Sequence, residues 1–242
     1  MTDMQAIAAR RSRRAYRGPV GDEAAHRLEH WAAQLNLENG LFIELRREGG
    51  AVFAGLRNSY GLFSGVHSLL VLAGRADDAD LDEKVGHAGQ RLVLEAVKMG
   101  LGSCWVGGTF DRQQVQSWLV PGHRAVAVIT VGPVKVGGSL MGRAAGRISG
   151  GRRKRPQQMM DTDSAPPEWF VAGVAAAAAA PSALGRQPVR FAWQAGVASA
   201  RVPEDRALQR VDLGIAKLHF EIAAGGRFAT GNGAAFEKAP DE

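Results

Sequence analysis

Residues 80–108, DLDEKVGHAGQRLVLEAVKMGLGSCWVGG, carry the strongest helix signal in the chain and end in a glycine-rich run. A helix over residues 80–99 would place one apolar face inward, formed by Val85, Gly89, Leu92, Val93, Ala96 and Val97. Gly100 is expected to end this helix. Because glycine has no side chain, residues 100–108 can bring backbone amides close to a flat ligand.

Weaker signals lie on both sides of this helix. Further helices are predicted over residues 4–11, 22–36, 167–180 and 207–224, and strands over 42–47, 66–73, 124–131, 189–193 and 197–202. The inward face predicted for the last helix is Leu208, Val211, Ile215, Leu218 and Ile222, and the last dozen residues are predicted to form a tail. Strands mixed with helices, without regular alternation, predict an α+β fold.

The composition changes sharply after the first half of the chain. Residues 137–165 are rich in Gly, Arg, Gln and Met and lack core periodicity, which predicts a basic connector. We therefore expect a first half over 1–136 and a shortened second half over 166–242. The intervals Gly89–Gly100 and Gly214–Gly225 have equal length and matching apolar positions, which is weak evidence for an internal duplication.

Composition excludes several classes of protein. The chain has 242 residues, of which 45% are hydrophobic and 22% charged, so neither a disordered nor a membrane protein is expected. The nearly apolar stretch 169–181 is too short to span a bilayer. Cys104 is the only cysteine, which excludes an intrachain disulfide. With no secretory signal visible, we expect a cytoplasmic protein.

Positive charge is concentrated in two places. The net charge is +6, with five arginines from Arg10 to Arg17 and a second basic group formed by Arg143, Arg147, Arg152, Arg153, Lys154 and Arg155. Such clusters can bind a nucleic-acid backbone, converge on one small phosphate group, or form a solvated basic face. Arginine forks beside a serine hydroxyl suit a phosphate monoester especially well.

Four segments carry the functional signal: RRSRRAYR at 10–17, GLGSCWVGG at 100–108, RRKRP at 152–156 and APSALGRQPVRF at 180–191. Together they resemble the FMN-dependent nitroreductase family, which has an Arg-Arg-Ser-x-Arg signature, a Gly-Leu-Gly-x-Cys-Trp segment, a basic-basic-Pro segment and a Pro-Ser-Ala-x-Asn-x-Gln-Pro-Trp segment. The resemblance covers residues 5 to about 225. It implies an α+β sandwich of sheet and helices.

The resemblance also implies roles for individual residues. Arg10, Arg11, Ser12 and Arg14, joined by Arg153 and Arg155, would bind the FMN phosphate. Pro181, Ser182 and Ala183 would pack along the flavin ring, and Val106, Gly107 and Gly108 would lie beside its reactive edge. Two positions depart from the family pattern: Gly185 replaces the usual Asn and Val189 the usual Trp.

The order of the segments implies an unusual member of the family. The Arg-Ser signature occurs only in the first half and the Pro-Ser-Ala segment only in the second. This pattern resembles the subgroup in which two fused half-repeats form a pseudo-dimer, so we expect a monomer with one FMN, bound by both halves. Hydride would pass from NAD(P)H through flavin N5 to a small electron acceptor, such as a nitroaromatic or quinone, in ping-pong fashion. No catalytic side chain is nominated.

Other chemistries have less support. Cys104 with His87 or His123 as base could form a nucleophilic pair, but no cysteine-enzyme signature surrounds it. The histidines lack metal-ligand spacing, so no metal site is proposed. A flavin-binding protein without turnover is one alternative. Nucleic-acid binding is the other, although no aromatic-basic interleaving or helix-turn-helix pattern favours it.

Overall fold

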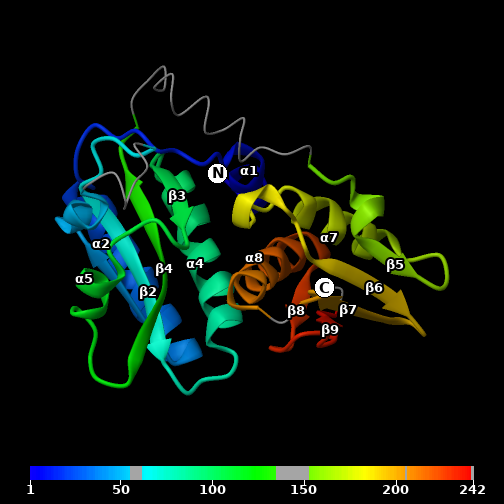
Figure 1. Ribbon diagram of the computed structural model, residues 1–242. Helices are drawn as coiled ribbons and strands as arrows, with labels where there is room; N and C mark the ends of the chain where they lie inside the picture. The colour runs from blue at the N-terminus through cyan, green and yellow to red at the C-terminus, as the bar shows by residue number, and fades with distance from the viewer. Residues whose placement is uncertain (55–61, 135–152, 205, 241–242) are drawn as a thin grey trace. The chain divides into compact units, whose positions relative to one another are not determined.

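The computed structural model describes residues 1–54, 62–134, 153–204 and 206–240 (Figure 1). The chain forms two compact units, each built from separate stretches of sequence. Unit 1 comprises residues 1–8, 82–91 and 150–242, and unit 2 comprises residues 9–81 and 92–149. Of the predicted connector, residues 137–152 lie outside the described residues. We describe each unit by itself.

Unit 2 is organised around a four-stranded sheet. Its strands are β1 (Leu41–Arg46), β2 (Ser68–Arg75), β3 (Gly102–Val106) and β4 (His123–Gly132), in the order β1-β2-β4-β3 with every neighbouring pair antiparallel. Every residue of β2 except Arg75 is buried. A strand whose two faces are both covered needs a continuous apolar run, as residues 69–73 provide. Strand β3 lies at one edge of this sheet, which matters for the site below.

Helices and a small core complete unit 2. They are α2 (Asp22–Asn39), η1 (Gly49–Phe53) and α5 (Arg112–Gln116), with residues 92–98 of α4 (Leu81–Lys98). The side chain of Asn36 joins α2 to β1, since its Nδ2 donates to Ile43 O at 3.0 Å and its Oδ1 accepts from Ile43 N at 2.7 Å. One face of the sheet packs in a cluster with Val52, Phe53, Phe110 and Val115.

Unit 1 is built around an aromatic core. Its elements are α1 (Asp3–Ala9), residues 82–91 of α4, η2 (Pro156–Met159), β5 (Met160–Thr162), α7 (Glu168–Ala178), η3 (Ala183–Gly185), β6 (Arg190–Gln194), β7 (Val197–Arg201), α8 (Ala207–Ala224), β8 (Gly226–Phe228) and β9 (Phe236–Lys238). Strands β5, β6 and β7 form one sheet and β8 and β9 a hairpin. Helices and strands together confirm the predicted α+β class.

Two details of unit 1 correct the sequence prediction. Leu208, assigned to the inward face of the last helix, is 48% exposed, whereas residues 211–221 are buried on every side of α8. The predicted tail contains β9, whose Phe236 is buried and stacks on Trp169 with ring centroids 5.4 Å apart. A three-residue strand is too short to show an alternating pattern, which is why it was missed.

Within unit 1, helices α4 and α8 cross at two glycines. A Cβ added to Gly86 would lie 2.1 Å from Val211 O, and one added to Gly214 would lie 2.0 Å from Glu83 O. Gly86 therefore faces Val211, three residues before Gly214, and Gly214 faces Glu83, three residues before Gly86. The absence of a side chain at both glycines lets the two helix backbones approach closely. The contact pairs Gly214 with Gly86, whereas the sequence comparison aligned Gly214 with Gly89, so the internal duplication stays a prediction.

Charged groups are buried beside this crossing. Lys217 Nζ donates to Glu83 Oε1 at 2.5 Å and to the carbonyl oxygens of Ala229 and Gly231, both at 2.9 Å. Both side chains are almost wholly buried. The added hydrogen bonds satisfy the charges that burial removes from water, so the pair fixes the β8–β9 hairpin against α4 and α8. Among the described residues, no helix is long and apolar enough to cross a bilayer.

Candidate functional site

The arginine-serine segment, residues 10–14, extends along the edge strand of unit 2. Ser12 forms a parallel bridge with Ser103 of β3, and Arg13 N donates to Ser103 O at 2.8 Å. Ser64 N in turn donates to Arg14 O at 2.9 Å. The segment is therefore attached to the edge of β3 at Ser103, and this attachment fixes its backbone beside the sheet.

The buried side chain of Tyr16 connects this segment to strand β4 by hydrogen bonds. The tyrosine is 1% exposed, and its phenol oxygen donates to Arg13 O at 2.5 Å and lies 2.7 Å from Thr130 Oγ1 on β4. Burial is the main cause that raises the pKa of Tyr16, and the electrostatic interaction with Cys104 acts in the same direction. The phenol therefore stays protonated and remains available as a hydrogen-bond donor.

Arg10, Ser12 and Arg14 of the segment interact with Cys104. Arg10 is buried, Arg14 is half-buried and Ser12 is exposed. Burial raises the pKa of the Cys104 thiol, while the positive charges of Arg14 and Arg10 and hydrogen bonds from Ser12 and Arg14 act to lower it. A protonated, buried thiol is a poor nucleophile, so the geometry gives no support to the cysteine alternative. It does bring Arg10, Ser12 and Arg14 together.

Strand β3 leads directly into the predicted ring-edge residues. Val106 is buried at the end of the strand, whereas Gly107 is half-buried and Gly108 exposed. A Cβ added to Gly108 would meet no atom within 4 Å. Arg112 on α5 donates to the carbonyl oxygen of Gly107. The backbone here is thus fixed on one side and open on the other, as contact with a flat ligand requires.

Replacing Tyr16 with phenylalanine is expected to lower the free energy of unfolding by about 1–3 kcal/mol, because Arg13 O and the Thr130 hydroxyl lose a buried partner. Urea denaturation measures the change. Thr130→Val, made alone and together with Tyr16→Phe, forms a double-mutant cycle. We expect the double variant to lose less stability than the two single losses combined. Strict additivity would contradict the proposed hydrogen bond between them.

In unit 1, the Pro-Ser-Ala segment forms a tightly bonded loop. Ser182 Oγ accepts from Gln187 N at 2.9 Å, and Ala183 N donates to Asp212 Oδ1 at 2.9 Å. Leu184 and Gly185 both have left-handed backbone angles, with φ of 53° and 68°. Asparagine and glycine are the residues that adopt this region most readily. Gly185 therefore keeps a backbone conformation compatible with the Asn of the family pattern, but it has no side chain to make a polar contact.

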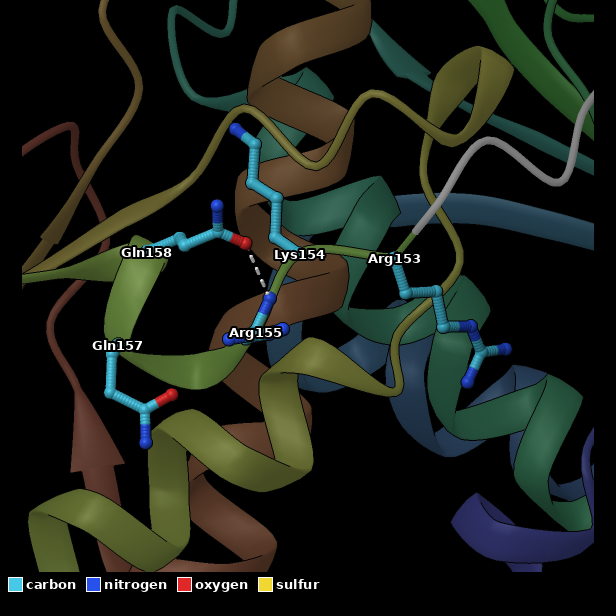
Figure 2. Close-up of a pocket in the computed structure, with 5 residues that line it drawn as sticks. All are labelled: Arg153, Lys154, Arg155, Gln157 and Gln158. Atoms are coloured by element: carbon cyan, nitrogen blue, oxygen red, sulfur yellow. Dashed lines mark hydrogen bonds between the residues drawn. The ribbon is translucent and has the colours of Figure 1, made fainter.

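The basic segment of unit 1 borders a pocket of about 610 Å³, lined by Arg153, Lys154, Arg155, Gln157 and Gln158 (Figure 2). Arg153 and Arg155 are exposed, whereas Lys154 is half-buried. Lys154 N donates to Gln187 Oε1 at 2.7 Å and Lys154 Nζ donates to Gln187 O at 2.8 Å. The structure therefore connects the basic segment to the Pro-Ser-Ala loop within this unit.

The predicted site residues consequently fall into two groups. Unit 2 holds Arg10, Arg11, Ser12, Arg14, Val106, Gly107 and Gly108, and unit 1 holds Arg153, Arg155, Pro181, Ser182, Ala183 and Gly185. Arg11 is exposed, and its guanidinium donates to Arg10 O at 2.8 Å. Sequence reasoning did not nominate Tyr16 or Asp212. An acid inside the apolar run of α8 is the one signal that could have indicated Asp212.

Asp212 gives the Pro-Ser-Ala loop a predicted dependence on pH. Burial raises the pKa of Asp212 to about 7, although the hydrogen bond from Ala183 acts to lower it. In the unfolded chain an aspartate has a pKa of about 3.9. The folded state therefore binds more protons between these values, and the free energy of unfolding should fall as pH rises through this window.

Asp212→Asn keeps an oxygen acceptor for Ala183 N and carries no charge, so it should remove this part of the pH dependence. Urea denaturation at about pH 5 and about pH 8 tests the prediction, and the variant should exceed the wild type in stability at the higher pH. Glu237→Gln, on the exposed surface of β9, is the matched control. Equal pH slopes for Asp212→Asn and wild type would contradict the assignment.

Comparisons with known proteins show the family and the fold. The model of the family described as "Putative TM nitroreductase" matches residues 3–224. The chain belongs to this nitroreductase family. A "putative nitroreductase" from Thermotoga maritima MSB8 has 16% identity and a TM-score of 0.60, with 98% of this chain and 92% of that chain covered. A comparison with curated proteins gives no match.

Two further structures share the nitroreductase fold over part of the chain. A "putative nitroreductase in complex with FMN" from Desulfovibrio desulfuricans has 21% identity and a TM-score of 0.50, covering 68% of this chain and 97% of that one. A nitroreductase family protein from Clostridium difficile 630 has 16% identity and a TM-score of 0.50, covering 68% and 100%. These similarities establish the nitroreductase fold predicted from the four segments.

Proposed function

We propose that this nitroreductase family member is an FMN-dependent oxidoreductase that uses NAD(P)H to reduce a small, electron-poor acceptor such as a nitroaromatic or quinone. The observation that carries the proposal is the grouping of Arg10, Ser12 and Arg14 beside edge strand β3, in a chain matched by a nitroreductase family model over residues 3–224. The FMN complex of the Desulfovibrio desulfuricans structure supports the choice of cofactor.

The residues present suit the phosphate end of FMN. A phosphate monoester carries nearly two negative charges and several acceptor oxygens, and two guanidinium groups with one hydroxyl supply matching charge and donors. Arg10 is 5% exposed, so its interaction with an anion would be screened little by solvent. The backbone that holds these groups is fixed by β3 and Tyr16, so little ordering would be needed on binding.

The remaining predicted residues stay part of the proposal. Arg153 and Arg155 would add positive charge to the phosphate, and Pro181, Ser182 and Ala183 would contact the ring system. Val106, Gly107 and Gly108 would lie beside the ring edge, where the backbone is open at Gly108. Bound FMN would supply the redox chemistry, by accepting a hydride and passing on the electrons, while the protein binds and orients it. No side-chain acid or base is assigned.

Steady-state kinetics test the proposed activity. Because the same position would receive the nicotinamide and then the acceptor, double-reciprocal plots at varied NAD(P)H and acceptor should give parallel lines. Intersecting lines would contradict a shared position. The purified protein should also be yellow. A colourless protein that binds DNA with a steep dependence on salt would favour the nucleic-acid alternative instead.

We also predict one FMN per chain. The Arg-Ser signature and the Pro-Ser-Ala segment each occur once in the sequence. A second phosphate site would lack its arginines, and an unpaired buried phosphate is costly. Flavin released by heat, measured against protein concentration, should therefore approach a ratio of one. A ratio near two would contradict the prediction.

A further inference from the structure

Gln187 makes four hydrogen bonds within unit 1. Its backbone N donates to Ser182 Oγ at 2.9 Å, and its Nε2 donates to Ala178 O at 2.8 Å. Its Oε1 accepts from Lys154 N at 2.7 Å, and its carbonyl oxygen accepts from Lys154 Nζ at 2.8 Å. One residue thus connects the basic segment, the Pro-Ser-Ala loop and the end of helix α7.

The carboxamide of Gln187 is matched to its surroundings. The side chain is 5% exposed, and it must donate to one backbone carbonyl while accepting from one backbone amide. A glutamate of the same length would turn an acceptor toward Ala178 O, and a methionine would satisfy neither group. The backbone of Gln187 is left-handed, with φ of 47°, which non-glycine residues adopt rarely. A conformation of this kind persists where its surroundings fix it.

The bonds to Lys154 determine how its neighbours are presented. In an extended backbone, successive side chains point in opposite directions. Lys154 is turned toward Gln187, and Figure 2 shows Arg153 extending in the opposite direction. Arg153 and Arg155 are exposed at the pocket, and neither forms an ion pair with any residue that the structure describes. The two guanidinium groups are therefore available to an anion while the residue between them is fixed.

We propose that Gln187 is a positioning residue for phosphate recognition: by holding the Lys154 backbone amide through its carboxamide, it presents Arg153 and Arg155 to the phosphate of FMN. This inference rests on the proposed function. It predicts that Gln187 affects the affinity for FMN far more than the affinity for riboflavin, which has the same ring system and no phosphate. A residue that only stabilised the fold would affect both ligands equally.

The test measures FMN and riboflavin dissociation constants for the full chain with Gln187→Met. FMN affinity should fall about tenfold, the effect of losing one well-placed charged contact, whereas riboflavin affinity should change less than about threefold. Gln113→Met, on the exposed side of α5, is the control and should leave both constants unchanged. Gln187→Asn provides a second variant that should fold, because asparagine tolerates the left-handed backbone, but its shorter side chain cannot reach both partners.

A second comparison tests whether Gln187 acts on FMN affinity through Arg153 and Arg155. In an Arg153→Ala, Arg155→Ala background, Gln187→Met should lower FMN affinity by less than about threefold, because the groups it presents are absent. An undiminished tenfold loss in that background would overturn the inference. Equal losses for FMN and riboflavin in either Gln187 variant would also overturn it and leave the proposed function standing. Absence of FMN binding by the wild type would instead contradict the proposed function.

Discussion

Replacing Arg10 and Arg14 together with alanine should weaken FMN binding by about a hundredfold or more. Each charge-assisted hydrogen bond to phosphate contributes about 1.5–3 kcal/mol, so each single variant should lose about tenfold or more. The effect is expected to be large because Arg10 is buried and both arginines are held near Ser12 and Cys104 by the backbone of β3. Fluorescence titration with FMN measures the loss.

Arg17→Ala is the matched control for this prediction. It removes an arginine from the same run, but Arg17 is exposed and follows Tyr16, beyond the part of the segment that adjoins β3. Its effect on FMN affinity should be less than about threefold. Riboflavin provides the second control, since it should bind the wild type weakly and be insensitive to Arg10→Ala. Equal affinity of the wild type for riboflavin and FMN would contradict the phosphate assignment.

Gly214→Ala is expected to lower the free energy of unfolding by about 2–3 kcal/mol, and Gly86→Ala by a similar amount. The added Cβ would lie 2.0 Å from Glu83 O and 2.1 Å from Val211 O respectively, and a backbone atom cannot move aside as a flexible side chain can. The higher helix propensity of alanine offsets only about 1 kcal/mol. Separation of the two helices would also disturb the buried Lys217–Glu83 pair.

Gly18→Ala is the control for both variants, because a Cβ there meets nothing within 4 Å and no positive φ is involved. Its stability should stay within about 0.5 kcal/mol of the wild type. Urea denaturation gives the comparison, provided that the slope of each transition is unchanged. If Gly214→Ala were as stable as the wild type, that result would contradict the close contact between Gly214 and Glu83.

Long periodic elements were predictable from the sequence because their burial repeats along the chain. The helix expected over residues 207–224 is α8 with those bounds, and β6 and β7 lie within one or two residues of their predicted positions. Prediction failed where burial is not periodic. Helix α8 buries residues on every side, including Asp212 and Lys217, so a one-face pattern misassigned Leu208. Strand β9 is too short to show a pattern and is held by packing of Phe236.

The candidate site was predictable only in its local parts. Arg10, Ser12 and Arg14 lie close together in sequence, and β3 brings them beside Cys104. The residues that position these groups were not predictable, because their partners are distant in sequence. Tyr16, beside the arginine-serine segment, is hydrogen-bonded to Thr130 of β4. In the other unit, Gln187 is hydrogen-bonded to Lys154 of the basic segment. Such pairings depend on the packed fold, which no local motif specifies.

The central claim is that this protein binds FMN and exchanges electrons between NAD(P)H and an acceptor. Anaerobic addition of NADH or NADPH to the FMN-loaded protein, followed by a nitroaromatic or quinone, tests it directly. We predict that the visible flavin absorption disappears with the nicotinamide and returns with the acceptor, with one nicotinamide oxidised per flavin. A protein that fails to bind FMN, or whose bound flavin stays oxidised with both nicotinamides, would contradict the account.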